Sequence, residues 1–303
     1  MLTSVLLQTE NETRAPVLAD PRVSASRLPA NFVPVATMVM RLLNFVHRAF
    51  GPEAVQQALS SSDLRVETHH LLSVSLAVCC CEWDRAPRDD VARTKSAPNV
   101  VNAANVDARG DVESRWTLDA LAELLDETLL FIGAFALLCP ANQDMLRWGR
   151  APTLAQRLPD LPFEYYADAK KKAALFPTLV AVAFRHPTNR AAIARDLSLE
   201  TVRAFVQAEI RAARAETSRD VRDTTERPLS DDVDDDDATF ASASSGPRGG
   251  SEKKSETSAS RGGSAAAAAG LPARFDFAAR FPPELWEDAA RDFASDDVTD
   301  SRA

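Results

Sequence analysis

The chain has 303 residues, of which 45% are hydrophobic and 26% are charged, so it can form a folded core with a charged surface. Leu and Ala dominate the apolar share, whereas Gly (10 residues) and Tyr (2 residues) are scarce, which favours helices over sheets. The longest apolar run, from Thr128 to Cys139, has twelve residues. A membrane-spanning helix needs about 20, so the pattern excludes direct membrane insertion.

The formal net charge of −9 is unevenly distributed. Between Arg147 and Arg214 there are 12 Lys or Arg and 6 Asp or Glu, a net charge of +6, so the rest of the chain carries −15. A basic segment inside an acidic chain suits an acidic partner. An ordinary solvated helix surface is the alternative interpretation.

The first part of the chain is predicted to contain a flexible segment, residues 1–30, and three helices. From Phe32 to Phe50, with Pro34 in the first turn, apolar residues recur at helical spacing. They predict a buried stripe made of Phe32, Val35, Val39, Leu42, Leu43, Val46 and Phe50. Gly51 and Pro52 end this helix and start a second one, which runs to about Leu59. A third helix is expected from about Leu64 to Trp83.

A long helix follows a predicted surface insertion. Residues 84–114 are rich in Arg, Asp, Asn and Ala and lack apolar periodicity, as is typical of an insertion. The helix from Trp116 to Leu138 is apolar almost all round in its second half, and Pro140 ends it. Neighbouring elements must therefore cover this helix on several sides.

Short helices separated by prolines complete the expected helical domain, residues 31–216. An apolar helix is predicted from Leu175 to Phe184, a short amphipathic one from Thr188 to Asp196, and a longer one from Ser198 to about Glu216. Helices joined by short turns predict an all-α fold, an irregular armadillo- or HEAT-like solenoid. No sequence repeat is visible, so a plain helical bundle is the alternative.

The C-terminal part is expected to contain a disordered acidic linker and a docking helix. Residues 217–271 hold Ser, Gly and Ala tracts and six Asp between Asp231 and Asp237, a composition that cannot offset the entropy of the chain. Residues 272–295 include an aromatic-rich helix from Phe275 to Phe293, which we expect to dock on the helical domain, with a partner protein as the alternative. Residues 296–303 form a tail.

The four cysteines are expected to be buried free thiols. Cys79, Cys80 and Cys81 are consecutive, and no C-x-x-C motif occurs, which is typical of a reducing compartment. On the same predicted helix, His70 and Cys81 are roughly 16 Å apart, too far for one zinc ion. We therefore expect no metal site.

The acidic pairs of the long helix, Asp119 with Glu123 and Asp126 with Glu127, are expected on its solvated side. Acid–base catalysis is the weaker interpretation of these carboxylates. The sequence contains no phosphate-binding Gly-rich loop, no G-x-S-x-G and no H-E-x-x-H. It predicts a non-enzymatic protein with no cofactor and no catalytic residue.

A basic rim is the candidate binding site. It consists of Lys170, Lys171, Lys172, Arg185, Arg190 and Arg195. If the helices that carry these residues stack as a pair, the side chains project outward along one edge and bind phosphates without base specificity. Ordinary surface charge is again the alternative.

Three strings in the second half of the chain resemble a known family. Residues 161–168 read LPFEYYAD, residues 175–181 read LFPTLVA, and residues 280–289 read RFPPELWEDA. They resemble the LPFxYxxD, LFPxLIA and RFPxxxWxxA strings in the C-terminal region of the family called S-phase cyclin A-associated protein in the endoplasmic reticulum, with Val180 in place of the Ile. The resemblance covers about residues 31–214 and the last helix.

The resemblance implies a non-enzymatic adaptor with protein partners, located in the cytoplasm and peripheral to the endoplasmic reticulum. Family members act in cell-cycle regulation and in tubulin mRNA control, where the C-terminal region sits on the ribosome and brings in the mRNA-decay machinery. Their cyclin-binding region and zinc-finger segment have no counterpart in these residues. A protein-only armadillo-like scaffold in the cyclin A/CDK setting, without RNA contact, is the alternative.

Overall fold

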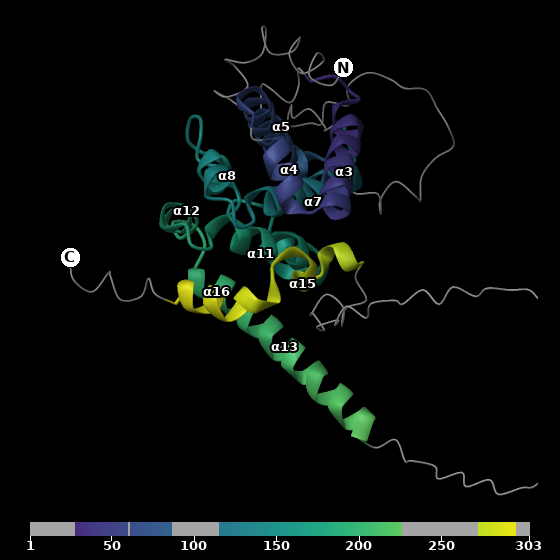
Figure 1. The fold of residues 1–303 in the computed structure, drawn as a ribbon. Helices are drawn as coiled ribbons and strands as arrows, with labels where there is room; N and C mark the ends of the chain where they lie inside the picture. The colour runs from purple at the N-terminus through teal and green to yellow at the C-terminus, as the bar shows by residue number, and fades with distance from the viewer. Residues whose placement is uncertain (1–27, 60, 87–114, 226–271, 295–303) are drawn as a thin grey trace, which may run out of the picture.

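A computed structural model describes residues 28–59, 61–86, 115–225 and 272–294 (Figure 1). All regular elements in these ranges are helices, in agreement with the all-α prediction. The expected N-terminal segment, most of the insertion at 84–114, most of the linker and the tail lie outside the described residues. Among the residues that the structure describes, no helix combines the length and the apolar character needed to cross a membrane.

The first helices are α3 (Phe32–Phe50), α4 (Pro52–Ala58) and α5 (Ser62–Glu82), followed by a 3-10 turn, η1 (Trp83–Arg85). Gly51 separates α3 from α4 with φ = 85°, a left-handed conformation that favours glycine. Pro52 then starts α4, where its missing N–H is not needed. The break predicted at these two residues is confirmed.

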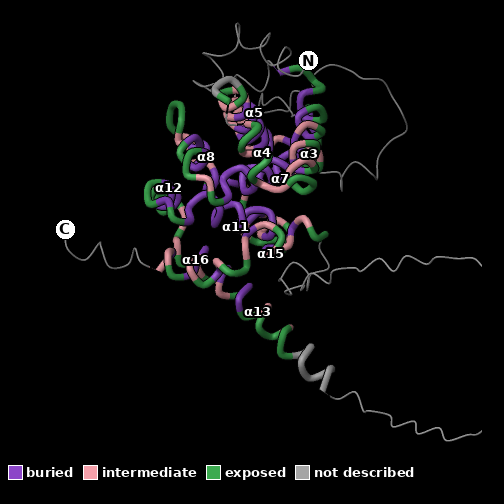
Figure 2. Tube along the Cα trace, viewed as in Figure 1, coloured by how far each residue is buried: buried purple, intermediate pink, exposed green. Residues whose placement is uncertain are grey.

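Helix α7 (Leu118–Ala136) is the centre of the fold, packed against α3, α5 and α11 (Ala169–Ala183). The Thr117 side chain caps its first turn by accepting from the Ala120 N–H. Every residue from Leu124 to Ala136 is buried, and Figure 2 shows α7 and α11 as the continuous interior. The prediction that neighbours cover this helix on several sides is confirmed.

The remaining helices pack around the pair formed by α7 and α11 and against one another. They are α8 (Pro140–Met145), α9 (Leu154–Arg157), α10 (Glu164–Ala167), α12 (Pro187–Ile193) and α13 (Leu199–Thr225). Helix α13 extends away from the body and continues nine residues beyond the predicted start of the linker at Thr217 (Figure 1). The helices gather around α7 and α11, and the armadillo-like arrangement stays a prediction.

The C-terminal segment returns to the body, but it is not the single helix predicted from Phe275 to Phe293. It consists of two 3-10 helices, η2 (Ala273–Phe275) and η3 (Pro283–Leu285), and two short α-helices, α15 (Phe277–Arg280) and α16 (Trp286–Asp292). Two prolines, Pro282 and Pro283, explain the break, because the first lies after the end of α15 and cannot continue its hydrogen bonding.

Aromatic packing holds this segment against α11 and α13. The Phe277 ring stacks on Phe281 and on Trp286, with ring centres 5.7 Å and 4.8 Å apart. Phe205 of α13 meets Phe277 edge-on at 5.3 Å, and Phe184 meets Phe281 in the same way. Such ring pairs add about 0.5–1.5 kcal/mol beyond the area they bury.

This packing predicts that the C-terminal segment is part of the cooperative fold. Replacing Phe281, which is 1% exposed, by Ala should lower the free energy of unfolding by about 3–5 kcal/mol, because it empties a filled site. The control Phe163→Ala, at a ring that is 77% exposed, should change it by less than about 0.5 kcal/mol. Urea unfolding followed by circular dichroism measures both values. Equal stability of the two variants would mean that the segment is only a loose appendage.

Candidate functional site

The structure divides the predicted basic rim into two groups. Lys170, Lys171 and Lys172 lie in the first turn of α11, whereas Arg185 lies just beyond its last turn. Lys171 and Arg185 are fourteen positions apart in a chain that is helical as far as Ala183, which corresponds to about 20 Å. The other two arginines belong to the second group, with Arg190 on α12 and Arg195 shortly after it.

Lys171 turns inward, against the expectation that all three lysines project outward. Its Nζ lies 3.1 Å from Asp126 Oδ1, and its side chain is 16% exposed. The Tyr165 hydroxyl donates to the same carboxylate at 2.7 Å. Burial and the Asp126 charge raise the pKa of Tyr165 well above its usual value, so the hydroxyl keeps the proton that it donates. Lys171 is therefore committed to an internal ion pair.

Two of the predicted rim arginines hold the C-terminal segment. Arg190 is buried and lies 2.6 Å from Asp292, while the Arg185 guanidinium lies 3.2 Å from Asp288. The Arg185 backbone N–H also donates to Asp292 at 2.8 Å. These contacts connect the turn between α11 and α12 to α16.

The remaining rim cations, Lys170, Lys172 and Arg195, form no ion pair with a described carboxylate. Lys170 and Arg195 are exposed and Lys172 is half-buried. Lys170 also lies over the Phe275 ring, 5.8 Å from its centre. Their RNA-binding role stays a prediction.

A groove of about 1040 Å³ lies beside Lys170 and Lys171. Five carboxylates and three cations line it, so its charge is not predominantly basic. The carboxylates are Asp119, Glu123, Asp126, Glu164 and Asp168, and the cations are Lys170, Lys171 and Arg274. A polyanion would meet repulsion along this surface as well as attraction.

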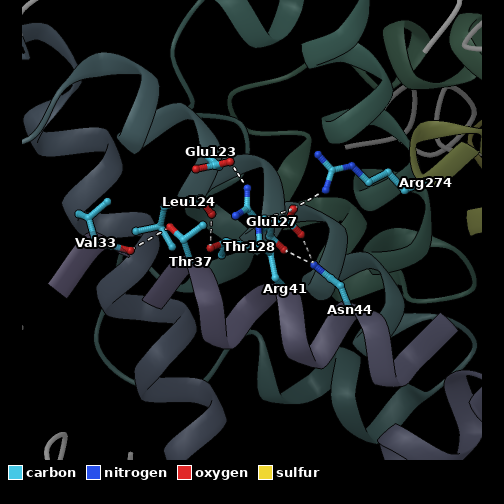
Figure 3. A network of polar contacts seen from close by, with 9 residues as sticks. All are labelled: Val33, Thr37, Arg41, Asn44, Glu123, Leu124, Glu127, Thr128 and Arg274. Atoms are coloured by element: carbon cyan, nitrogen blue, oxygen red, sulfur yellow. Dashed lines mark hydrogen bonds and ion pairs between the residues drawn. The ribbon is translucent and has the colours of Figure 1, made fainter. Parts of the chain in front are cut away.

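Glu127 corrects the expectation that the acidic pairs of the long helix are solvated. Asp119 and Glu123 are exposed, but Asp126 is 5% and Glu127 only 1% exposed. Figure 3 shows donors from two other parts of the chain converging on Glu127. Asn44 of α3 donates to it at 2.8 Å, and Arg274 of η2 lies 2.5 Å away.

Arg41 adds an ion pair, with its Nε 3.6 Å from Glu127, and forms a second ion pair with Glu123 (Figure 3). A buried carboxylate is tolerated only when it is paired and hydrogen-bonded. Glu127 meets both conditions by using α3 and η2 together. The two buried carboxylates of α7 therefore hold neighbouring elements in place, which the spacing of acidic residues alone did not reveal.

Helix α3 buries a face that only partly matches the predicted one, since Phe32 is buried and Val39, Leu43 and Val46 are partly buried against the core. The buried side consists of Phe32, Val33, Ala36, Thr37, Met40 and Asn44. Of the predicted stripe, Val35, Leu42 and Phe50 are exposed. A polar contact explains this difference. Asn44 donates hydrogen bonds to Glu127, and the need to face Glu127 sets the rotation of α3 about its axis.

The rotation leaves an apolar face of α3 in solvent. We call it the α3 face, and it consists of Val35, Met38, Leu42 and Phe45, which are 39%, 70%, 58% and 59% exposed. These residues follow one another at spacings of three, four and three, so they line one side of the helix. Clusters of this kind mark interaction surfaces more often than single exposed apolar residues do. Sequence reasoning assigned two of the four to the core.

Of the four cysteines expected to be buried, Cys79 is buried, whereas Cys80, Cys81 and Cys139 are only partly buried. The Cys79 thiol is buried and donates to the Leu121 carbonyl at 3.5 Å. Burial raises the pKa of Cys79 well above its usual value and that of Cys80 to about 12, so both stay protonated thiols. Within the described ranges, no group of three or more His, Cys, Asp or Glu side chains could hold a metal ion.

Comparisons with known proteins give one partial similarity. No protein-family model matches the chain. A human protein named S phase cyclin A-associated protein in the endoplasmic reticulum is 33% identical over 84 residues. This stretch is 28% of the present chain and 6% of the human protein, so the chain spans a small part of that relative's length. The similarity supports, over this stretch, the relationship that the three sequence strings predicted.

Two adjacent lysines give a direct test of the internal ion pair. Lys171→Met should lower the free energy of unfolding by about 2–3 kcal/mol, because it leaves the Asp126 carboxylate buried without a cation. Lys172→Met, at a residue without an ion pair, should change it by less than about 0.5 kcal/mol. Chemical denaturation of the two variants measures the difference. If they are equally stable, Lys171 does not stabilise the buried carboxylate.

Proposed function

We propose that this chain is a non-enzymatic adaptor that binds an amphipathic helix of a partner protein on the α3 face. The observation that carries the proposal is the exposure of Val35, Met38, Leu42 and Phe45 on one side of a helix whose opposite side is buried. A soluble protein seldom leaves a continuous apolar stripe of this kind in water without a partner.

The spacing of the stripe favours a helical partner. From Val35 to Phe45 it extends about 15 Å, or three helical turns. Residues at successive intervals of three and four form the seam that a second helix fills with its own apolar side.

The charge at the edge of the stripe favours acidic residues on the partner helix. Arg48 is exposed near its C-terminal end and forms no ion pair with the described carboxylates. Arg41 lies on the same flank, three residues from Met38, and already pairs with Glu123. A partner helix with a carboxylate beside its apolar side would meet Arg48 and would be attracted over a longer range.

The setting of this adaptor is taken from the relative and the family resemblance. The name of the human relative describes association with cyclin A and location in the endoplasmic reticulum. We place the present chain by analogy in cell-cycle regulation, in the cytoplasm and peripheral to that organelle. Analogy with one stretch of a longer protein supports this placement, and the α3 face supports the protein-binding role independently.

A photo-crosslinking amino acid at position 42 tests the proposal in cells. Its crosslinks should map to an amphipathic helix with acidic residues in another protein, because Leu42 lies in the middle of the α3 face. Met38→Glu should abolish the crosslink, since a charge on the stripe must be desolvated on binding. It should leave thermal unfolding unchanged, because Met38 is 70% exposed.

Two other occupants would contradict the proposal. A crosslink to residues 1–27 of the same chain would mean that the α3 face is covered internally. A crosslink to a second copy, with a dimer in light scattering that Met38→Glu dissociates, would make it an oligomer interface. A control crosslinker at Ala191, an exposed residue of α12, identifies background contacts.

An RNA-binding adaptor at the ribosome, acting with the mRNA-decay machinery, is the second candidate. The observation that favours it is that Lys170, Lys172 and Arg195 form no ion pair with a described carboxylate. The groove beside the lysines, with its five carboxylates, argues against it. The protein-only adaptor is therefore the preferred function.

Charge reversal at the three unpaired cations distinguishes the two candidates. If RNA is bound, changing Lys170, Lys172 and Arg195 to Glu should abolish co-sedimentation with ribosomes, and wild-type binding should fall steeply with salt. Reversal of the paired Arg185, Arg190 and Lys171 is unsuitable, because it would also disrupt the fold. Unchanged co-sedimentation of the triple variant, with intact helicity, would rule out these residues as the RNA contact.

A further inference from the structure

A second cavity lies between the C-terminal part of α3, helix α7 and the C-terminal segment. Its volume is about 170 Å³. The charged or titratable residues that line it are all basic: His47, Arg48, Arg274 and Arg280. Its other walls are Asn44 and the apolar residues Leu130, Ala134, Ala273 and Ala279.

Arg280 is held in this cavity wall without a carboxylate. Its guanidinium donates to the Ala173 carbonyl at 2.5 Å, to the Ala174 carbonyl at 2.9 Å and to Thr178 Oγ1 at 2.7 Å. All three acceptors are neutral. Burial lowers the pKa of Arg280 to about 9, and the Asp126 charge opposes this shift only in part.

The position of Arg280 is built into the packing of α7 and α11. Pro177 has no N–H, so the Ala173 carbonyl four residues earlier loses its helical donor and accepts from Arg280 instead. Gly133 of α7 makes room, since a Cβ there would lie 3.1 Å from Arg280 Nη2. The guanidinium is therefore kept in place by two helices and can present a charge without moving.

His47 and Arg48 complete the basic wall. Burial, Arg48 and Arg280 lower the pKa of His47, so its ring offers hydrogen-bonding capacity and Arg48 supplies the charge. His47 Nδ1 is enclosed and has no hydrogen-bond partner. Arg48 forms no ion pair with the described carboxylates and reaches the cavity from its exposed side. Glu127, the nearby carboxylate, does not line the cavity and is already shared by Asn44, Arg41 and Arg274.

We propose that this cavity binds a small phosphate monoester, with Arg48, Arg274 and Arg280 around the phosphate and the apolar walls around a small organic body. A phosphate monoester carries a charge of about −1.5 to −2 and three acceptor oxygens, which suits three arginines better than a single carboxylate does. At about 10–15 Å³ for each water, the cavity has room for such a group.

The site shares Arg48 with the edge of the α3 face, but its other residues are different, and neither proposal depends on the other. The apolar residues Val35, Met38 and Leu42 do not line the cavity. A ligand here would connect α3 to the C-terminal segment through Arg48 and Arg274 and so stabilise the docked form by mass action.

Isothermal titration of the purified full chain with phenyl phosphate tests the site. We expect saturable binding to one site, weaker binding of inorganic phosphate, which lacks the apolar body, and weaker binding of benzoate, which has less charge. Arg48→Gln should weaken phenyl phosphate binding by about tenfold or more, the effect of losing a charge-assisted hydrogen bond. Arg211→Gln, at an exposed arginine on α13, is the matched control and should bind as the wild type does.

A second variant distinguishes a loss of binding from a loss of folding. Ala279→Asp places a carboxylate on the exposed side of the cavity and should abolish binding while the thermal unfolding of the free protein stays the same. The proposal is wrong if phenyl phosphate does not bind the wild type saturably. It is also wrong if Arg48→Gln binds as tightly as Arg211→Gln, because the charge would then come from elsewhere on the surface.

Discussion

Two adjacent carboxylates, Asp126 and Glu127, are buried on the central helix, and much of the structure is arranged to satisfy them. A buried charge destabilises a fold unless donors and cations surround it. Lys171 of α11 forms an ion pair with Asp126, and the Tyr165 hydroxyl of α10 donates a hydrogen bond to it. Asn44 of α3 donates a hydrogen bond to Glu127, and Arg274 of the C-terminal segment forms an ion pair with it (Figure 3). Helix α7 thereby determines the rotation of α3 as well as the place where the chain returns.

The same requirement explains which surfaces are left for binding partners. Lys171, Arg185 and Arg190 are used inside the molecule, so the basic character of the sequence between Arg147 and Arg214 overstates the charge available outside. The rotation of α3 toward Glu127 leaves the apolar α3 face in solvent. Surplus cations gather instead at the cavity beside Arg280, where Pro177 and Gly133 make room for a guanidinium without a carboxylate.

Local signals predicted much of the fold. Gly51 and Pro52 located the break after α3, and the all-round apolar character before Pro140 identified α7 as the central helix. These features depend on local backbone preferences and on the pattern of apolar residues, and both can be read from a short stretch of sequence. Pro282 and Pro283 carried a similar signal for the broken C-terminal helix, although the aromatic spacing suggested a continuous one.

The candidate sites depend on contacts that no sequence window contains. The Glu127 partners Asn44 and Arg274 lie 83 and 147 residues away in the chain, so acidic spacing on α7 could only suggest a solvated face. The division of the basic rim follows from the length of α11, which separates Lys171 from Arg185. The apolar α3 face was visible as a set of residues, but which side of α3 is buried was decided by one polar contact.

A double-mutant cycle between Glu127 and Arg274 tests most directly whether the buried carboxylate joins the C-terminal segment to the core. The free energy of unfolding is measured for wild type, Glu127→Gln, Arg274→Gln and the double variant. If the account is correct, the two substitutions are coupled by about 1 kcal/mol or more, because each removes the same ion pair. Additivity within about 0.5 kcal/mol would contradict it, since the segment would then be docked independently of Glu127.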